Sequence, residues 1–259
     1  MADPLPQLRV ADARRALGQL AAAWRSRFTE PLIALTGSNG KTTLKEMIAA
    51  ILRVRGATLA TEGNLNNDLG APLTLLRLNV EHAYAVIEMG ANHHGEIAYL
   101  TGLARPDVAI INNAGPCHLD GFGDIAGVAQ GKGEIFQGLG PDGVAIINRD
   151  DQYADYWAGL NPGRRIIGFG LEQPATVRGE ILDPVSNRFR LIAPEGEIEI
   201  NGDRQVVVLT GVARVVDIGP GNVIPSSVLG QLSIRYFGRG LTKGSLTPGW
   251  LVRIINKVF

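Results

Sequence analysis

The sequence lacks the features that mark extracellular, membrane-bound and nucleic-acid-binding proteins. Its 259 residues include one cysteine, Cys117, so no disulfide can form within the chain, which favours a reducing compartment. The 25 basic and 25 acidic side chains cancel, so no excess charge attracts nucleic acid or an anionic membrane surface. The N-terminus lacks the layout of a signal peptide, and no apolar run has the length of a membrane span. We therefore expect a cytoplasmic protein with no nucleic-acid partner and no membrane segment.

A glycine-rich loop is the clearest motif that is present. The apolar run 32–35 predicts a strand before it, and a helical apolar face predicts a helix after it, made by Leu44, Met47, Ile48, Ile51 and Leu52. The loop consists of Thr36, Gly37, Ser38, Asn39, Gly40, Lys41, Thr42 and Thr43. Such a strand–loop–helix unit wraps phosphates with backbone N–H groups, while its lysine reaches the outer phosphates and its hydroxyl holds Mg²⁺. We interpret it as a nucleotide-binding loop. Leu35 stands where the full pattern has its first glycine, and a plain glycine turn is the alternative.

Strands alternate with helices up to residue 147. The predicted strands are 57–61, 83–88, 107–111 and 143–147, and the predicted helices are 71–78, 96–104 and 125–139. This alternation of short apolar strands with helices predicts an α/β fold with a doubly wound, mainly parallel sheet. Strand-like runs without helices follow at 165–169, 177–182, 188–192, 197–200, 205–210, 212–216 and 233–237, before a short terminal helix at 249–259. The sequence therefore predicts a β-rich C-terminal segment after the α/β part.

Polar residues gather where the predicted strands end, which is the edge at which parallel α/β sheets bind ligands. Glu88 ends one strand, Asn112 and Asn113 end another, and His118 follows. Mg²⁺ prefers carboxylates together with phosphate oxygens, so Glu88 could bind it together with Thr42; a solvated strand end is the alternative. His118 is a candidate ligand or base, with a structural role as its alternative. The neighbouring Cys117 and Asp120 are interpreted as a packing residue and as a loop or cap residue.

Lys132 lies on an apolar face of the predicted helix 125–139. It shares that face with Val128, Ile135, Phe136 and Leu139. Burial of a lysine costs desolvation, which lowers its pKa and favours the neutral amine. A side chain that snorkels along the face to solvent is the alternative to a functional role.

Six segments in fixed order resemble the Mur ligases. They are 36–42, 63–68, 87–93, 112–113, 118–123 and 132–136. The resemblance covers about residues 6–200 and implies an ATP-dependent ligase of peptidoglycan precursor synthesis. In this reaction ATP phosphorylates a carboxylate of UDP-N-acetylmuramoyl-tripeptide, and the amine of D-alanyl-D-alanine attacks the acyl phosphate to form an amide.

The resemblance also implies roles for individual residues. Lys41 and the loop amides hold the ATP phosphates, Thr42 and Glu88 hold one Mg²⁺, and His118 helps to hold a second. Lys132 matches a lysine that CO₂ carbamylates, which turns a buried amine into an anionic oxygen ligand. Lys41, His118 and Lys132 are thus the expected catalytic residues. Asn66, Asn67 and His93 are the expected substrate contacts.

The resemblance divides the chain into three parts. Residues 1–30 are expected to be the remnant of an N-terminal domain or linker, 31–200 the ATP-binding domain, and 201–259 a β-rich tail. Within the tail, segments 206–212, 217–222, 225–227 and 248–251 resemble the C-terminal end of the flagellar L-ring protein, so we expect an incomplete, fused ligase. A structural fragment of the flagellar ring and a noncatalytic nucleotide-binding domain are the alternatives. Nucleotide binding separates the ligase from the ring fragment, and ligation separates it from the noncatalytic domain.

Overall fold

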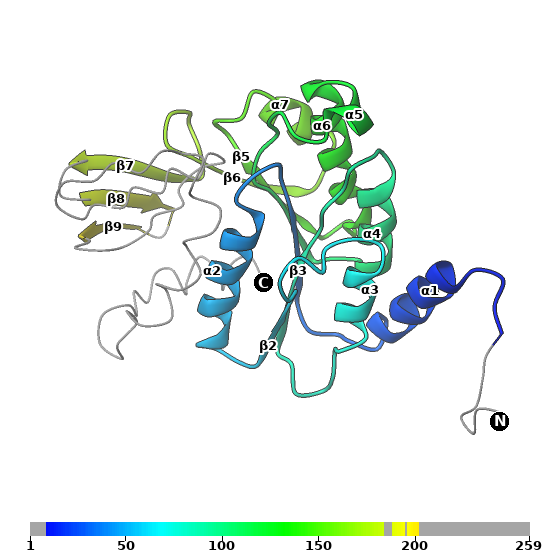
Figure 1. Ribbon diagram of the computed structural model, residues 1–259. Helices are drawn as coiled ribbons and strands as arrows, with labels where there is room; N and C mark the ends of the chain where they lie inside the picture. Colours follow the sequence, from blue (N-terminus) through cyan, green and yellow to red (C-terminus); the bar gives the residue numbers. More distant parts are fainter. Residues whose placement is uncertain (1–8, 184–187, 195, 202–259) are drawn as a thin grey trace, which may run out of the picture.

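The computed structural model describes residues 9–183, 188–194 and 196–201 (Figure 1). The strands are β1 (Leu32–Thr36), β2 (Thr58–Ala60), β3 (Tyr84–Glu88), β4 (Val108–Ile111), β5 (Val144–Asn148), β6 (Arg165–Gly170), β7 (Val177–Asp183), β8 (Arg188–Ala193) and β9 (Gly196–Asn201). The helices are α1 (Ala13–Arg25), α2 (Lys41–Arg53), α3 (Gly70–Leu75), α4 (Glu96–Ala104), α5 (Leu119–Phe122), α6 (Ile125–Gly133) and α7 (Ala154–Gly159), with a 3₁₀ helix η1 (Glu134–Gly138).

One mixed sheet runs through the described residues in the order β2-β3-β1-β4-β5-β6-β7-β8-β9. All neighbours from β2 to β7 are parallel, and β7, β8 and β9 are joined antiparallel. This confirms the predicted α/β fold class and the β-rich character of the chain that follows it. The strands predicted at 205–210, 212–216 and 233–237 and the helix at 249–259 lie outside the described residues.

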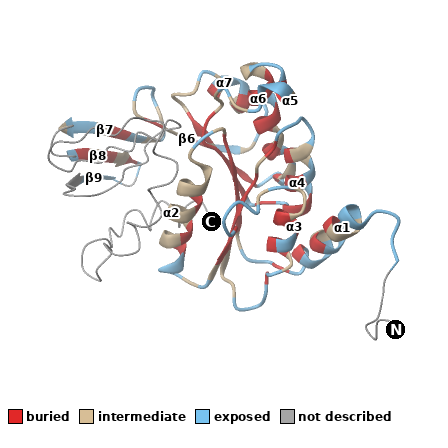
Figure 2. Ribbon diagram, in the orientation of Figure 1, coloured by how far each residue is buried: buried red, intermediate tan, exposed pale blue. Residues whose placement is uncertain are grey.

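Each central strand contributes to two cores, because successive side chains point to opposite faces of a sheet. In β1, Leu32 and Ala34 join the core that includes residues of α1, α3, α4, α6 and α7. Ile33 and Leu35 join the core on the other face, where α2 packs. Figure 1 shows α2 on one side of the sheet and α3 and α4 on the other, and Figure 2 shows the buried strands between these layers. The short apolar strands in the sequence follow from this double cover.

The predicted helix 125–139 is wrong beyond Gly133, where the chain tightens into η1. Glycines bring this segment close to its neighbours. A Cβ on Gly131 would overlap the ring of Phe122, and one on Gly138 would overlap Thr101. The face assigned to Lys132 is nevertheless buried, because the described packing holds both helical pieces against the core.

Helix α1 was not predicted, although its sequence is amphipathic. The Asp12 side chain caps it by accepting the Arg15 N–H at 3.0 Å, as expected of an aspartate at this position. At its other end, the buried Arg25 donates from Nε to the Ala104 carbonyl at 2.7 Å. The hydrogen bond of Arg25 attaches α1, which lies in the segment 1–30, to α4. In the described part of the chain no helix is long and apolar enough to cross a membrane.

Truncation of Ile87 to alanine should lower the free energy of unfolding by about 2–5 kcal/mol, because it opens a cavity at a fully buried position in β3. Val80→Ala is the matched control. Val80 is fully exposed, so its loss should change the free energy by less than about 0.5 kcal/mol. Urea unfolding of the three proteins measures both values. Equal losses in the two variants would contradict the described sheet.

Candidate active site

The glycine-rich loop joins β1 to α2, as predicted. Gly40 sits just before the helix with φ of 75°, a left-handed conformation that glycine adopts without strain. A Cβ on Gly40 would lie 2.9 Å from Asn112 Nδ2, so side-chain bulk is excluded as well. Thr36 is buried and donates from Oγ1 to the Met89 carbonyl at 2.7 Å. The loop thus lies against the ends of β3 and β4, at the carboxyl edge of the sheet.

Lys41 begins α2 and folds back over the loop. Its Nζ donates to the carbonyl oxygens of Gly37, at 2.8 Å, and Ser38, at 3.2 Å. Burial lowers the pKa of Lys41, while the charges of Glu88 and Cys117 act to raise it. The Lys41 ammonium group therefore lies in the electrostatic field of Glu88, the strand-end carboxylate predicted for the same site.

Glu88 is 1% exposed, so it is not a solvated strand end. Its Oε1 accepts from Asn66 Nδ2 at 2.8 Å and from Thr42 Oγ1 at 3.3 Å. Its Oε2 is buried and has no hydrogen-bond partner among the described residues. A buried carboxylate oxygen without a partner is costly, and a cation beside it would remove that cost. The donor set of Glu88 and Thr42 consists of hard oxygens and fits Mg²⁺.

No group of three or more histidine, cysteine, aspartate or glutamate side chains is arranged to hold a metal ion in the described ranges.

Lys132 is 1% exposed, and its Nζ lies 5.4 Å from the centroid of the Phe122 ring. Burial, followed by the charge of Lys41, lowers the pKa of Lys132 from 10.5 to about 8, against the opposing charges of Cys117, Glu134 and Glu96. The two lysines therefore influence each other although they are far apart in the chain. The snorkelling alternative does not hold, because the side chain is enclosed.

His118 is exposed and precedes α5 with φ of 51°. Left-handed backbone is uncommon for a residue other than glycine and costs energy, which often marks functional sites. No described hydrogen bond or ion pair joins its side chain to Glu88 or Lys132. Next to it, Cys117 is half-buried, packs against the core, and has Sγ 3.0 Å from Ser38 Oγ. Asp120 lies exposed in the first turn of α5.

The three expected substrate contacts lie in different settings. Asn66 donates to Glu88, as described above. Asn67 Oδ1 accepts the N–H groups of Gly70, at 2.8 Å, and Leu69, at 3.2 Å, at the start of α3. His93 is exposed and has Nδ1 3.2 Å from Glu96 Oε1. Asn66 thus belongs to the Glu88 cluster, whereas Asn67 serves local structure.

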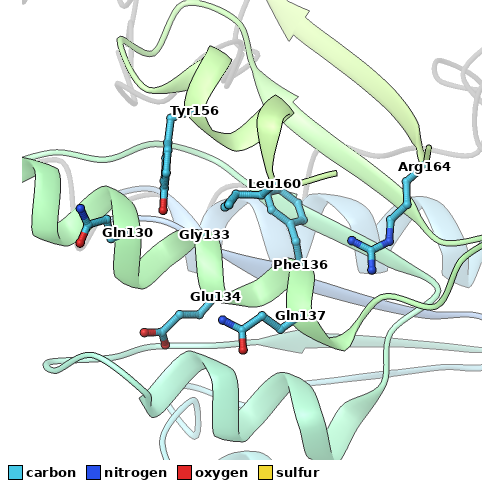
Figure 3. Close-up of a pocket in the computed structure, with 8 residues that line it drawn as sticks. All are labelled: Gln130, Gly133, Glu134, Phe136, Gln137, Tyr156, Leu160 and Arg164. Atoms are coloured by element: carbon cyan, nitrogen blue, oxygen red, sulfur yellow. The ribbon is translucent and has the colours of Figure 1, made fainter. Parts of the chain in front are cut away.

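A cavity of about 290 Å³ lies between α7 and the α6–η1 segment (Figure 3). It is lined by Gln130, Gly133, Glu134, Phe136, Gln137, Tyr156, Leu160 and Arg164. Glu134 is committed to α4, since its carboxylate accepts the N–H groups of Gly95 and Ala98. The lining includes no residue of the loop 36–43, so this cavity is separate from the candidate phosphate site.

Two further buried residues of this region, Phe122 and Lys45, were not predicted from the sequence. Phe122 covers Lys132 and also meets the His94 ring edge-on at 5.1 Å between centroids. Lys45 is fully buried and donates from Nζ to the Thr61 carbonyl at 2.6 Å, while Thr61 Oγ1 accepts the Glu88 N–H. The spacing of Lys45 with the buried Ala49 and Leu52 was the available signal, since i, i+4 and i+7 share one helix face.

The fold and the loop define an α/β protein with a P-loop-type strand–loop–helix unit. The chain belongs to the Mur ligase family, since the model of the Mur ligase middle domain matches residues 35–203. The UDP-N-acetylmuramoyl-tripeptide–D-alanyl-D-alanine ligase of Escherichia coli is 47% identical over 199 residues, which cover 76% of this chain and 44% of that protein. The ligase of the same name from Haemophilus influenzae is 48% identical over 253 residues, covering 94% of this chain and 54% of that protein.

Solved structures agree. MurF from Acinetobacter baumannii superposes with a TM-score of 0.72 and 43% identity over 78% of this chain and 45% of that chain. MurF ligase from Thermotoga maritima, solved in complex with ADP, superposes with a TM-score of 0.66 and 26% identity over 75% of this chain and 45% of that chain. The chain therefore spans about half the length of the relatives that it matches.

The C-terminal part has two kinds of match. The model of the flagellar L-ring protein matches residues 174–259, which overlap the end of the middle-domain match. The alignment with the H. influenzae ligase also extends into this part, because it covers 94% of the chain.

Between pH 8 and 10.5 the free energy of unfolding should rise more steeply in the unchanged protein than in Lys132→Met. Below about pH 8 the folded and unfolded chains both hold the Lys132 proton, and the cost of the buried charge is fully present. Above it the folded chain releases the proton while the unfolded chain keeps it up to its ordinary pKa, so stability increases with pH. Urea unfolding in CO₂-free buffers measures both curves. Parallel curves would contradict the burial of Lys132.

Proposed function

We propose that this chain provides the ATP-binding site of a ligase that joins D-alanyl-D-alanine to UDP-N-acetylmuramoyl-tripeptide. The observation that carries the proposal is the buried Glu88 carboxylate, whose Oε1 accepts from the Thr42 hydroxyl of the glycine-rich loop and whose Oε2 has no partner among the described residues. An anionic group placed there calls for a cation, and a P-loop-type unit next to it supplies amides and a lysine for phosphates. The names of the relatives and the ADP complex of one of them support the same nucleotide and substrates.

In this proposal Thr42 and Glu88 would hold Mg²⁺, which would neutralise charge on the phosphates. Lys41 leaves the carbonyl oxygens of Gly37 and Ser38 and turns to the outer phosphates. The substrate carboxylate takes the phosphoryl group, and the amine of the dipeptide then displaces phosphate to form the amide. The protein contributes mostly position and charge, as in other phosphoryl transfers. His118 remains the proposed contributor to a second Mg²⁺ site, and His93 a proposed substrate contact.

Lys132 is proposed to act as a carbamate. Carbamylation requires the neutral amine, and a pKa of about 8 leaves about a tenth of the amine neutral at pH 7, compared with less than about a thousandth at a pKa of 10.5. The charge of Lys41, which acts to lower the pKa of Lys132, also favours conversion of Lys132 into an anion. A carbamate would provide hard oxygen ligands.

We propose that residues 31–200 form the ATP-binding domain, 1–30 belong to an N-terminal domain or linker, and 201–259 form a separate tail. The middle-domain match to residue 203 supports the boundary near 200. The L-ring match supports an origin of the tail in a flagellar ring protein, while the H. influenzae alignment supports continued ligase sequence.

Lys41→Ala should weaken Mg²⁺–ATP binding at least about tenfold, because a charge-assisted contact to phosphate is lost. Arg53→Ala is the matched control, since Arg53 is a half-exposed cation at the other end of the same helix. Titration calorimetry with Mg²⁺–ATP compares the three proteins. Equal affinities in all three would remove the proposed nucleotide site.

Addition of ¹³C-bicarbonate should give a carbamate signal in ¹³C NMR and a matching mass increase, both lost in Lys132→Met. Lys45→Met tests whether burial of a lysine suffices, because Lys45 is equally buried but its Nζ is engaged by Thr61 and Glu46. We expect the signal to persist in that control. A signal that survives Lys132→Met would assign the adduct elsewhere and end the proposed role of Lys132.

A further inference from the structure

We infer that Asn113 is a positioning residue that sets the shape of the phosphate-binding loop before nucleotide arrives. The inference rests on the proposed function and assigns a role that the strand-end location of Asn113 alone does not give. Asn113 follows β4, whereas the loop follows β1, so the two are joined only by the fold.

The side-chain amide of Asn113 is used at both ends. Its Oδ1 accepts the N–H groups of Ser38, at 3.0 Å, and of Asn39, at 2.9 Å. Its Nδ2 donates to the Asn39 carbonyl at 3.0 Å. A flipped amide would turn two donors toward two N–H groups, so only one orientation satisfies the loop. The Ser38 N–H also donates to the Asn113 backbone carbonyl at 3.0 Å, so the Asn39 peptide unit depends on the side chain more than the Ser38 unit does.

The hydrogen bonds of the Asn113 side chain to Ser38 and Asn39, called the Asn113 brace below, are themselves supported by strand ends. Asn113 is 6% exposed, and the adjacent Asn112 donates from Nδ2 to the same Asn39 carbonyl at 2.8 Å. Asn148, at the end of β5, donates from Nδ2 to the Asn112 carbonyl at 3.0 Å. The loop is thus tied to the ends of two neighbouring strands, and sites built on strands hold their geometry better than free loops.

This arrangement divides the amides of the loop into two groups. Ser38 and Asn39 give their N–H groups to Asn113. The first N–H groups of α2, which begins at Lys41, have no partner within the helix and remain for an anion. The brace therefore aims the helix N-terminus and the Lys41 side chain without occupying the amides that phosphate needs. Preorganisation of this kind raises affinity, because less ordering remains to be done on binding.

Amide hydrogen exchange at Ser38 and Asn39, followed by NMR on the full chain, tests the brace directly. In Asn113→Ala the Asn39 amide should exchange at least about tenfold faster, because its acceptor is lost. The Ser38 amide keeps the backbone carbonyl of residue 113 as an acceptor at 3.0 Å, so its rate should change less and serves as an internal reference. In Asn113→Asp one oxygen still faces the Asn39 N–H, but the other replaces the donor to the Asn39 carbonyl, so the rate should lie between those of the unchanged protein and Asn113→Ala. Unchanged exchange of Asn39 in Asn113→Ala, or exchange of Asn39 in the unchanged protein as fast as in an unfolded peptide, would overturn the inference. The second comparison decides even if the alanine variant does not fold.

Calorimetry with Mg²⁺–ATP separates positioning from structural support. The folded Asn113→Ala protein should bind Mg²⁺–ATP about tenfold more weakly than the unchanged protein. Asn79→Ala is the matched control, since Asn79 Oδ1 also accepts a backbone N–H, that of Glu81, but in an exposed turn outside the loop. It should bind normally. Faster exchange with unchanged affinity in Asn113→Ala would make Asn113 merely structural. Failure of the unchanged protein to bind Mg²⁺–ATP would overturn the proposed function, and the exchange rates would still decide whether Asn113 sets the loop.

Discussion

The buried carboxylate of Glu88 is the constraint around which the site is arranged. A charge removed from water is tolerated only when donors or cations surround it. Asn66 and Thr42 serve one oxygen, and the other has no partner within the described chain. Because Glu88 ends β3, its position is fixed by a central strand, and the loop after the neighbouring β1 is brought to it by strand pairing.

Three lysines of the α/β part are held in different ways. Lys45 is held by a carbonyl and by Glu46, so its charge is locally compensated. Lys41 donates to loop carbonyls, which it can leave for an anion. Lys132 has an aromatic ring beside it, and burial together with the charge of Lys41 lowers its pKa. The three side chains show that burial alone does not define the role of a lysine; its partners do.

The sequence was sufficient for features that depend on local pattern. Apolar runs located the strands, helical spacing located α2, and the polar strand end singled out Glu88. Patterns could not reveal the hydrogen bonds of Asn113 to Ser38 and Asn39, because strand order brings together residues distant in the chain. They also missed the change to η1, since the close approach of Gly138 to Thr101 is known only from the fold. Helix α1 was missed although its sequence is amphipathic, with Gly18, Ala21 and Arg25 on its buried face.

The crossover from β3 to β4 has a consequence for how this chain acquires its site. Strand β1 lies near the start of the chain but pairs with β3 and β4, which lie much later in the sequence. Contacts between distant segments form slowly, because closing the chain between them costs conformational entropy before the contacts stabilise the fold. The loop after β1 gains its Asn113 brace only when β4 has entered the sheet. During synthesis on the ribosome the loop is therefore complete as sequence long before it is complete as structure, and its ordering reports that the centre of the sheet has closed.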